Sequence, residues 1–158
     1  VITGCGVAQL TAIAMCAKAA EKHGVPIIAD GGLRSSGDIV KALAAGAQSV
    51  MLGSILAGTI ETPGPIRNGR KQYRGMASRS AQDSWRGGVP EGMAPEGESR
   101  SVPIKGHVAD VVLELAGGLR SAMSYINAKT ISEIAENARF MELTARGHLE
   151  SMAHGLSR

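Results

Sequence analysis

The sequence predicts an α/β fold, namely the C-terminal part of a (β/α)8 TIM barrel that carries a long flap loop and C-terminal helices. Two short apolar runs, at 26–29 and 49–52, each end in glycine or a small polar residue, and a helical pattern joins them. This is the order of successive β/α units in a parallel sheet. Strands buried on both faces need neighbouring strands, and two units are too few to close a barrel. We therefore expect the final two strands of a barrel, in a chain that begins inside a longer protein.

The composition is that of a globular domain with an aliphatic core. Of 158 residues, 44% are hydrophobic but only 3% are aromatic. The formal net charge of +3 is spread along the chain without a block of like charges, which argues against nucleic acid or a membrane surface as a partner. Cys5 and Cys16 make neither a disulfide framework nor a metal cluster, so we expect a reducing, cytoplasmic location. The sequence shows no signal peptide or membrane span.

The first part of the chain alternates helices and strands, with small residues at their ends. Gly24 follows a helical pattern as a stop signal, Ser35 or Ser36 caps the next helix, and Gly46 ends it. The predicted elements are a helix over 7–23, a strand over 26–29, a helix between the serine cap and Gly46, and a strand over 49–52.

The middle of the chain, 59–106, keeps neither the two-residue period of a strand nor the 3.6-residue period of a helix. It is rich in glycine, proline and charged residues. A loop of this length is typical of a lid or a binding element. Helical spacing returns at Val108, and Thr130 with Glu133 forms a capping box for a short helix. A strand is expected over 140–144, and no structure is assigned from Ala145 onward. One catalytic unit is therefore expected over 1–158, divided into β/α units (1–58), flap and nucleotide loops (59–106), and helix and tail (107–158).

The two strand ends predict a phosphate site. Loops after the last two strands of a barrel commonly bind phosphate through backbone N–H groups. Asp30 lies at one strand end, where a carboxylate accepts hydrogen bonds from ribose hydroxyls, or instead caps the N–H groups of its own loop. The glycines after both strands allow a ligand to approach the backbone closely, or they are present only because the turns require glycine. The expected contacts of the two loops are Asp30, Gly31, Gly32, Gly53 and Ser54.

Six motifs extend this pattern: ADGGLRSSGDIVKALAAGA, VMLGS, ETPG, YRGMAS, VPIKG and GGLRSAMSY. Together they resemble the IMP dehydrogenase/GMP reductase family over nearly the whole chain. The resemblance implies a homotetrameric TIM barrel that acts on a purine nucleoside monophosphate with NAD or NADPH, through a covalent bond between a cysteine and the purine C2. FMN-dependent hydroxyacid oxidases share part of the pattern, so an FMN-type or non-catalytic phosphate-binding barrel is the remote alternative.

The resemblance also implies roles for individual residues. Asp30 holds the ribose, while Gly31 lies in the same loop. Met76 and Ser121 contact the cofactor. The nucleophilic cysteine falls in a segment before Val1, so Cys5 is not that residue, Cys16 is a core residue, and this chain alone is expected to be inactive. The implied phosphate ligands are Gly32, Gly53, Ser54 and Tyr73, and the implied base contacts are Gly75, Met76, Ala77, Glu91 and Gly97.

The two reactions of the family differ in their flap residues. The dehydrogenase activates water with an Arg-Tyr pair, which this flap lacks, whereas the reductase uses a flap glutamate, here Glu96. Met93, Ala94 and Pro95 precede Glu96 and are expected to desolvate it. GMP reductase (GMP + NADPH to IMP + NADP + ammonia) is therefore the first choice, with Glu96 catalytic.

The tail favours the alternative, IMP dehydrogenase (IMP + NAD + water to XMP + NADH). It resembles the tail of bacterial dehydrogenases, whose backbone carbonyls bind a monovalent cation such as potassium. The implied ligands here are Glu150, Ser151 and Met152.

Overall fold

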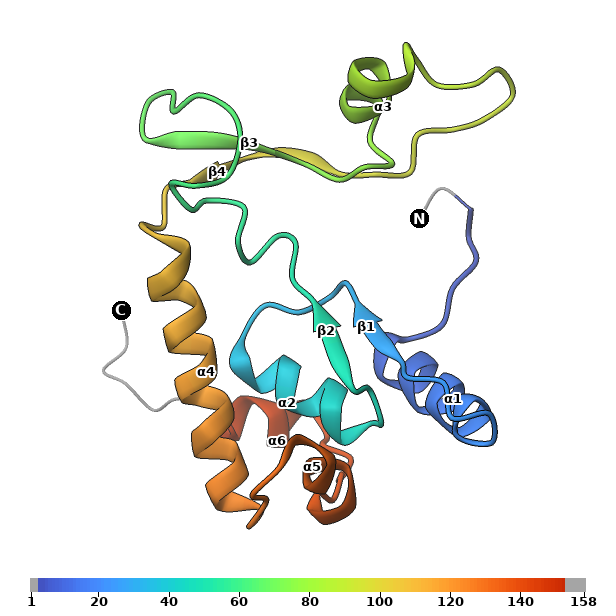
Figure 1. Cartoon of the computed structure of the whole chain (residues 1–158), viewed down its shortest axis with the longest axis vertical. Helices are drawn as coiled ribbons and strands as arrows, with labels where there is room; N and C mark the ends of the chain where they lie inside the picture. Colours follow the sequence, from blue (N-terminus) through green and yellow to red (C-terminus); the bar gives the residue numbers. More distant parts are fainter. Residues whose placement is uncertain (1–2, 153–158) are drawn as a thin grey trace.

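The computed structural model describes residues 3–152 (Figure 1). None of the helices in that range is long and apolar enough to cross a membrane. The helices and strands are, in chain order, α1 (Gln9–Glu21), β1 (Ile28–Asp30), α2 (Ser36–Ala44), β2 (Ser49–Met51), β3 (Arg70–Arg74), α3 (Arg79–Arg86), β4 (Ser99–Pro103), α4 (Val108–Tyr125), α5 (Ile131–Asn137) and α6 (Ala145–Glu150).

The strand–helix–strand unit predicted from the apolar runs is confirmed. Strands β1 and β2 pair in parallel, with Ala29 opposite Val50, and α2 connects them. The side chain of Ser35 caps α2 by accepting a hydrogen bond of 3.3 Å from the Asp38 amide. Gly46, with φ +107°, ends the turn after α2, a conformation that side-chain-bearing residues rarely adopt. Local capping and turn chemistry therefore set the limits of this unit.

The core lies where α2 packs against α4 and α5 (Figure 1). Aliphatic side chains dominate it, as the composition predicted, and Ile134 of α5 is fully buried. The predicted capping box is present: Thr130 accepts from the Glu133 amide at 3.4 Å, and the Glu133 carboxylate accepts from the Lys129 amide at 2.7 Å. These bonds satisfy amide groups that a helix N-terminus otherwise leaves unpaired.

The expectation of an irregular segment over 59–106 is wrong. Strands β3 and β4 form an antiparallel hairpin, with Arg70 opposite Pro103 and Arg74 opposite Ser99. Helix α3 and a long loop lie between the two strands and extend from the far end of the hairpin (Figure 1). Periodicity did not reveal the hairpin because its strands are mostly polar and its one buried residue in β3 is Lys71.

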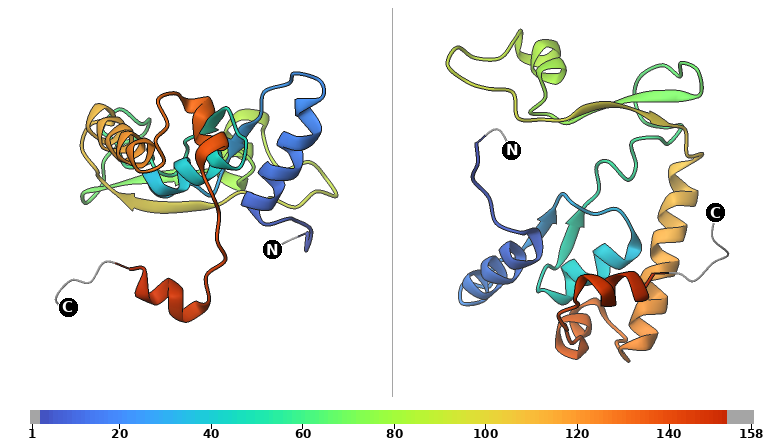
Figure 2. Two further views of the ribbon diagram at one scale, coloured as in Figure 1. Left: turned by 90° about the horizontal axis from the view of Figure 1, so that it is seen from below. Right: turned by 180° about the vertical axis from the view of Figure 1, so that it is seen from behind.

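Two further expectations are corrected in the rest of the chain. Residues 140–144 do not form a strand, since no described strand pairs with them, and Phe140 is 54% exposed. Helix α6 follows instead, and Figure 2 shows it projecting from the main body. Cys16 was expected in the core but is exposed on α1.

The described strands form two separate two-stranded sheets and no closed barrel. Ile28 of β1 and Met51 of β2 are 56% and 51% exposed, although both belong to a parallel pair. Parallel strands are normally covered on both faces, so these apolar side chains mark surface that further parts of an α/β fold would cover.

Candidate functional site

The two predicted phosphate loops lie side by side. Because β1 and β2 pair in parallel, Asp30 is opposite Met51, and Gly53 follows two residues later. Gly31 and Gly32 have φ values of +86° and +77°, so the chain turns there in a conformation suited to glycine. The Gln9 side chain donates a hydrogen bond of 2.8 Å to the Asp30 carbonyl. This bond fixes the backbone at the strand end and leaves the exposed Asp30 carboxylate available for a ligand.

Tyr73 reaches this site from the hairpin. A side-chain carbon placed on Gly53 would lie 3.7 Å from the Tyr73 hydroxyl. Gly53 and Ser54 come from the loop after β2, whereas Tyr73 comes from β3, so two distant segments converge on one location. Tyr73 is half-buried, and the Arg100 guanidinium lies 5.7 Å from its ring centroid. A backbone, two hydroxyls and a nearby cation are suited to bind a phosphate group.

The predicted base-contacting segment and the flap glutamate are brought together by backbone hydrogen bonds. The Gly97 amide donates to the Ala77 carbonyl at 2.9 Å, and the Gly75 amide donates to the Glu98 carbonyl at 2.8 Å. A side chain on Gly97 would collide with the backbone of Ala77 and Ser78, so only glycine permits this approach. Glu96 is therefore held beside the 75–77 segment.

The predicted surroundings of Glu96 are wrong in one respect. Met93, expected to help desolvate the carboxylate, is 64% exposed, and Glu96 is itself exposed. Glu91 lies in an exposed turn that is closed by a hydrogen bond of 3.1 Å from the Met93 amide to the Pro90 carbonyl. Within residues 3–152, no hydrogen bond joins Glu91 to the 75–77 segment. The structure thus brings Glu96, rather than Glu91, next to that segment.

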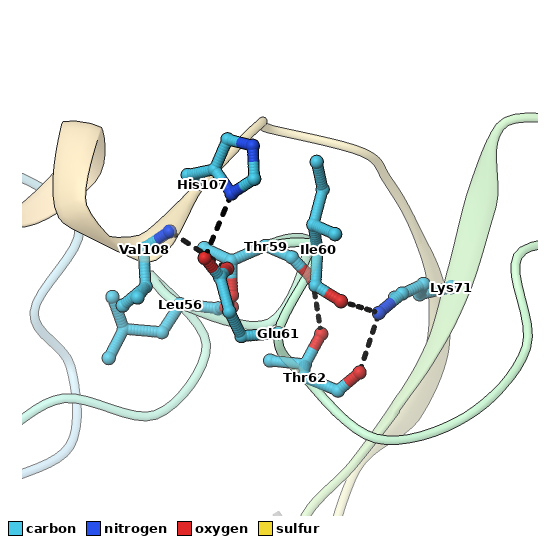
Figure 3. A network of polar contacts seen from close by, with 8 residues as sticks. All are labelled: Leu56, Thr59, Ile60, Glu61, Thr62, Lys71, His107 and Val108. Carbon is cyan, nitrogen blue, oxygen red and sulfur yellow. Dashed lines mark hydrogen bonds and ion pairs between the residues drawn. The ribbon is translucent and has the colours of Figure 1, made fainter.

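The turn at 59–62 connects the site to the rest of the fold, and the sequence did not identify its role (Figure 3). The Glu61 carboxylate accepts hydrogen bonds from the Val108 amide at 2.9 Å and from Nδ1 of His107 at 3.0 Å, and so caps α4. The Val108 amide and the contact with His107 hold the pKa of Glu61 below its ordinary value. The motif ETPG, which contains Glu61, was the available signal.

Lys71 contacts the same turn from the hairpin side. Its Nζ donates to the backbone carbonyls of Ile60 at 2.7 Å and Thr62 at 2.5 Å (Figure 3). Only 4% of Lys71 is exposed, and its neighbour Thr59 is 1% exposed. Charged donors are rarely buried unless they are fully hydrogen-bonded, so this arrangement specifies where the hairpin meets the turn.

The predicted cofactor contacts do not meet within one chain. Met76 is 69% exposed beyond the end of β3, where the hairpin leads away from α4. Ser121 lies in the second half of α4, about 20 Å along the helix from its first residue at 1.5 Å per residue. The described residues therefore do not assemble a cradle for a nicotinamide cofactor.

The remaining predicted groups lie away from the site. Ser151 ends α6, its hydroxyl bonded to the His148 carbonyl at 2.8 Å, with Glu150 and Met152 on either side. Their proposed cation ligation stays a prediction. No group of three acidic, histidine or cysteine side chains suited to a metal occurs in the range 3–152. Cys5 is exposed before α1.

A family model described as the IMP dehydrogenase / GMP reductase domain matches residues 1–154. Among similar curated proteins, inosine-5'-monophosphate dehydrogenase of Methanocaldococcus jannaschii is 49% identical, over 99% of this chain and 35% of that protein. Inosine-5'-monophosphate dehydrogenase of Aquifex aeolicus is 51% identical, over 98% of this chain and 34% of that protein.

A solved structure gives a further comparison. The crystal structure of GMP reductase from Trypanosoma brucei in complex with guanosine 5'-monophosphate superposes with a TM-score of 0.89 at 48% identity, covering 98% of this chain and 33% of that one. The chain thus spans about a third of the length of the proteins it matches.

Proposed function

Because the chain belongs to the IMP dehydrogenase/GMP reductase family, we propose that the protein is an NAD(P)-dependent oxidoreductase of purine nucleoside monophosphates. Two contacts carry this proposal: Tyr73 of β3 approaches the Gly53 loop, and the 75–77 segment that follows β3 is hydrogen-bonded to the flap at 97–98. A nucleotide spanning these groups has its phosphate at the Gly53 loop and its base at 75–77. The protein is further proposed to act as a homotetramer.

The chain's own residues bind and orient the nucleotide in this proposal. The Asp30 carboxylate accepts hydrogen bonds from the ribose hydroxyls at the end of β1. Backbone amides of Gly32 and Gly53 and the hydroxyls of Ser54 and Tyr73 hold the phosphate, since such donors suit an anion. The reactive cysteine is predicted to lie in a segment before residue 1.

The first choice of reaction is GMP reduction, and the flap supports it. Releasing ammonia requires a group that supplies a proton to the leaving 2-amino group, and a carboxyl group does so by general acid catalysis. The Gly97–Ala77 hydrogen bond holds Glu96 beside the base-contacting segment. The flap sequence contains no Arg-Tyr pair, and the guanidinium of Arg86 stacks on Trp85 at 4.2 Å from the ring centroid.

The second candidate is IMP dehydrogenation, and the names of the relatives favour it. The curated relatives at 49% and 51% identity are both called inosine-5'-monophosphate dehydrogenase. The dehydrogenase must activate a water molecule, and the flap arginines available for that task are Arg79, at the start of α3, and Arg86, at its end, although the spacing of the flap favours neither. The tail at 150–152 would then supply carbonyl oxygens to a monovalent cation such as potassium.

A direct assay on the full-length protein tests the proposal. The enzyme is incubated with GMP and NADPH, and separately with IMP and NAD, while absorbance of the reduced nicotinamide is followed. Loss of signal with GMP alone supports the reductase, whereas gain of signal with IMP alone, with XMP as product, supports the dehydrogenase. No turnover and no binding of either nucleotide would overturn the proposed function and favour a non-catalytic phosphate-binding barrel.

A further inference from the structure

Lys71 is a buried ammonium group that the proposed function does not use. It is 4% exposed, and both of its hydrogen-bond acceptors are backbone carbonyls, those of Ile60 and Thr62. No carboxylate of the described residues lies within ion-pair distance of its Nζ. Burying a charged group in this way is unfavourable unless the hydrogen bonds it makes are retained. The side chain therefore fixes strand β3 to the turn at 59–62.

Because Lys71 and Tyr73 lie on the same strand, fixing Lys71 also fixes the position of Tyr73. Residues two apart in a strand lie on the same face, and the burial of β3 follows this rule, with Lys71 buried and Tyr73 half-buried between exposed neighbours. The turn at 59–62 follows the Gly53 loop along the chain. It is tied to α4 through Glu61, and the Ile60 amide donates to the Gly106 carbonyl at 2.8 Å. Lys71 thus joins a fixed turn to the strand that carries Tyr73.

We propose that Lys71 is a positioning residue, one that holds the Tyr73 hydroxyl against the Gly53 loop and so sets the affinity for the phosphate of the nucleotide. This rests on the proposed function. Tyr73 stands 3.7 Å from a side-chain carbon placed at Gly53. Among the described residues, Lys71 is the residue of β3 whose hydrogen bonds reach the turn at 59–62, and the other partners of that turn from later in the chain lie at 106–108. Without Lys71, β3 loses its direct hydrogen bonds to the turn, and a hydrogen-bonding group displaced by about 1 Å loses most of its contribution.

The test compares a nucleotide with its nucleoside in the full-length enzyme. Lys71→Met keeps the length of the side chain but removes the donors. Gln72→Met is the matched control, because Gln72 lies on the exposed face of the same strand and its side chain donates to the Ser99 hydroxyl, at 2.9 Å, and not to the turn. Dissociation constants are measured calorimetrically for GMP and guanosine, or for IMP and inosine if the wild type prefers them.

Lys71→Met is expected to weaken nucleotide binding by about tenfold, the effect of one lost charge-assisted hydrogen bond, and nucleoside binding by less than about twofold. Gln72→Met is expected to change neither. In a double-mutant cycle, adding Tyr73→Phe to the Lys71→Met enzyme should weaken nucleotide binding little further. Equal losses for nucleotide and nucleoside, or additive effects of the two substitutions, would overturn the inference.

A second measurement covers the case in which Lys71→Met does not fold. If the Lys71 contacts strengthen phosphate binding, then phosphate binding must stabilise the Lys71 contacts by the same free energy, because the coupling between two sites is reciprocal. In the wild type, the nucleotide should therefore slow hydrogen exchange at 59–62 and 70–74 more than the nucleoside does. Equal protection by both ligands contradicts the inference. A wild type that binds neither ligand points instead to failure of the proposed function.

Discussion

The Gly97 amide donates a hydrogen bond of 2.9 Å to the Ala77 carbonyl, and a side chain at Gly97 would collide with the same stretch of backbone. These two residues are 20 positions apart, Gly97 in the segment that leads into β4 and Ala77 in the turn after β3. Their contact is what holds Glu96 at the candidate site, so the chemistry proposed for the flap depends on one close backbone approach.

Substitution of Gly97 by alanine should separate the flap from the turn. The added carbon cannot be accommodated against Ala77 and Ser78 without a shift of backbone. We expect kcat to fall by about 100-fold, because small displacements of a reacting group have effects of that size. Steady-state kinetics of the full-length enzyme measure it. Gly37→Ala is the control, since its carbon would meet only the Ser35 hydroxyl at 3.6 Å, and a Gly97→Ala enzyme as active as that control would contradict the contact.

Neighbouring glycines in α4 should respond oppositely to alanine. A side chain on Gly118 would collide with the side chain of Ser36 on α2, whereas nothing lies within 4 Å of one on Gly117. Gly118→Ala should lower the free energy of unfolding by about 1–3 kcal/mol through overpacking. Gly117→Ala should raise it by about 0.5–1 kcal/mol, since alanine favours a helix. Chemical denaturation tests both, and equal effects would mean that α2 and α4 do not pack as described.

The Glu61 cap should give the fold a dependence on pH. The Val108 amide lowers the pKa of Glu61 below its ordinary value of 4.5, so the ionised carboxylate stabilises the folded chain above that pH. This contribution is lost as the pH falls through the lowered pKa. Glu61→Gln should reduce the melting temperature near neutral pH and flatten its fall between about pH 5 and pH 3. If the melting temperatures of wild type and variant changed with pH in the same way, the result would contradict the Glu61 cap.

The first part of the chain was predictable because its pattern is local. Serine and glycine signals at Ser35 and Gly46 fixed the ends of α2, and the capping box at Thr130 fixed the start of α5. The adjacency of the two phosphate loops followed from parallel pairing alone.

The hairpin was not predictable in the same way. Its inward-facing residue in β3 is a lysine, and the acceptors of that lysine are backbone carbonyls, which no residue type in the sequence reveals. The strand expected at 140–144 failed for the opposite reason. Phe140, Met141 and Leu143 are apolar, but a strand also requires a partner, and none is present among residues 3–152. Long-range backbone contacts, rather than local preference, decided both regions.

The measurement that most directly tests the central claim is the activity of Glu96→Gln in the full-length enzyme with GMP and NADPH. Glu98→Gln is the matched control, because Glu98 is two residues away on the same flap, its side chain makes an exposed ion pair with Arg100 at 3.5 Å, and its backbone bond to Gly75 does not depend on the side chain. A catalytic Glu96 predicts a loss of kcat of about 100-fold or more, with Glu98→Gln within about twofold of wild type. Full activity of Glu96→Gln, or turnover of IMP with NAD in its place, would contradict it.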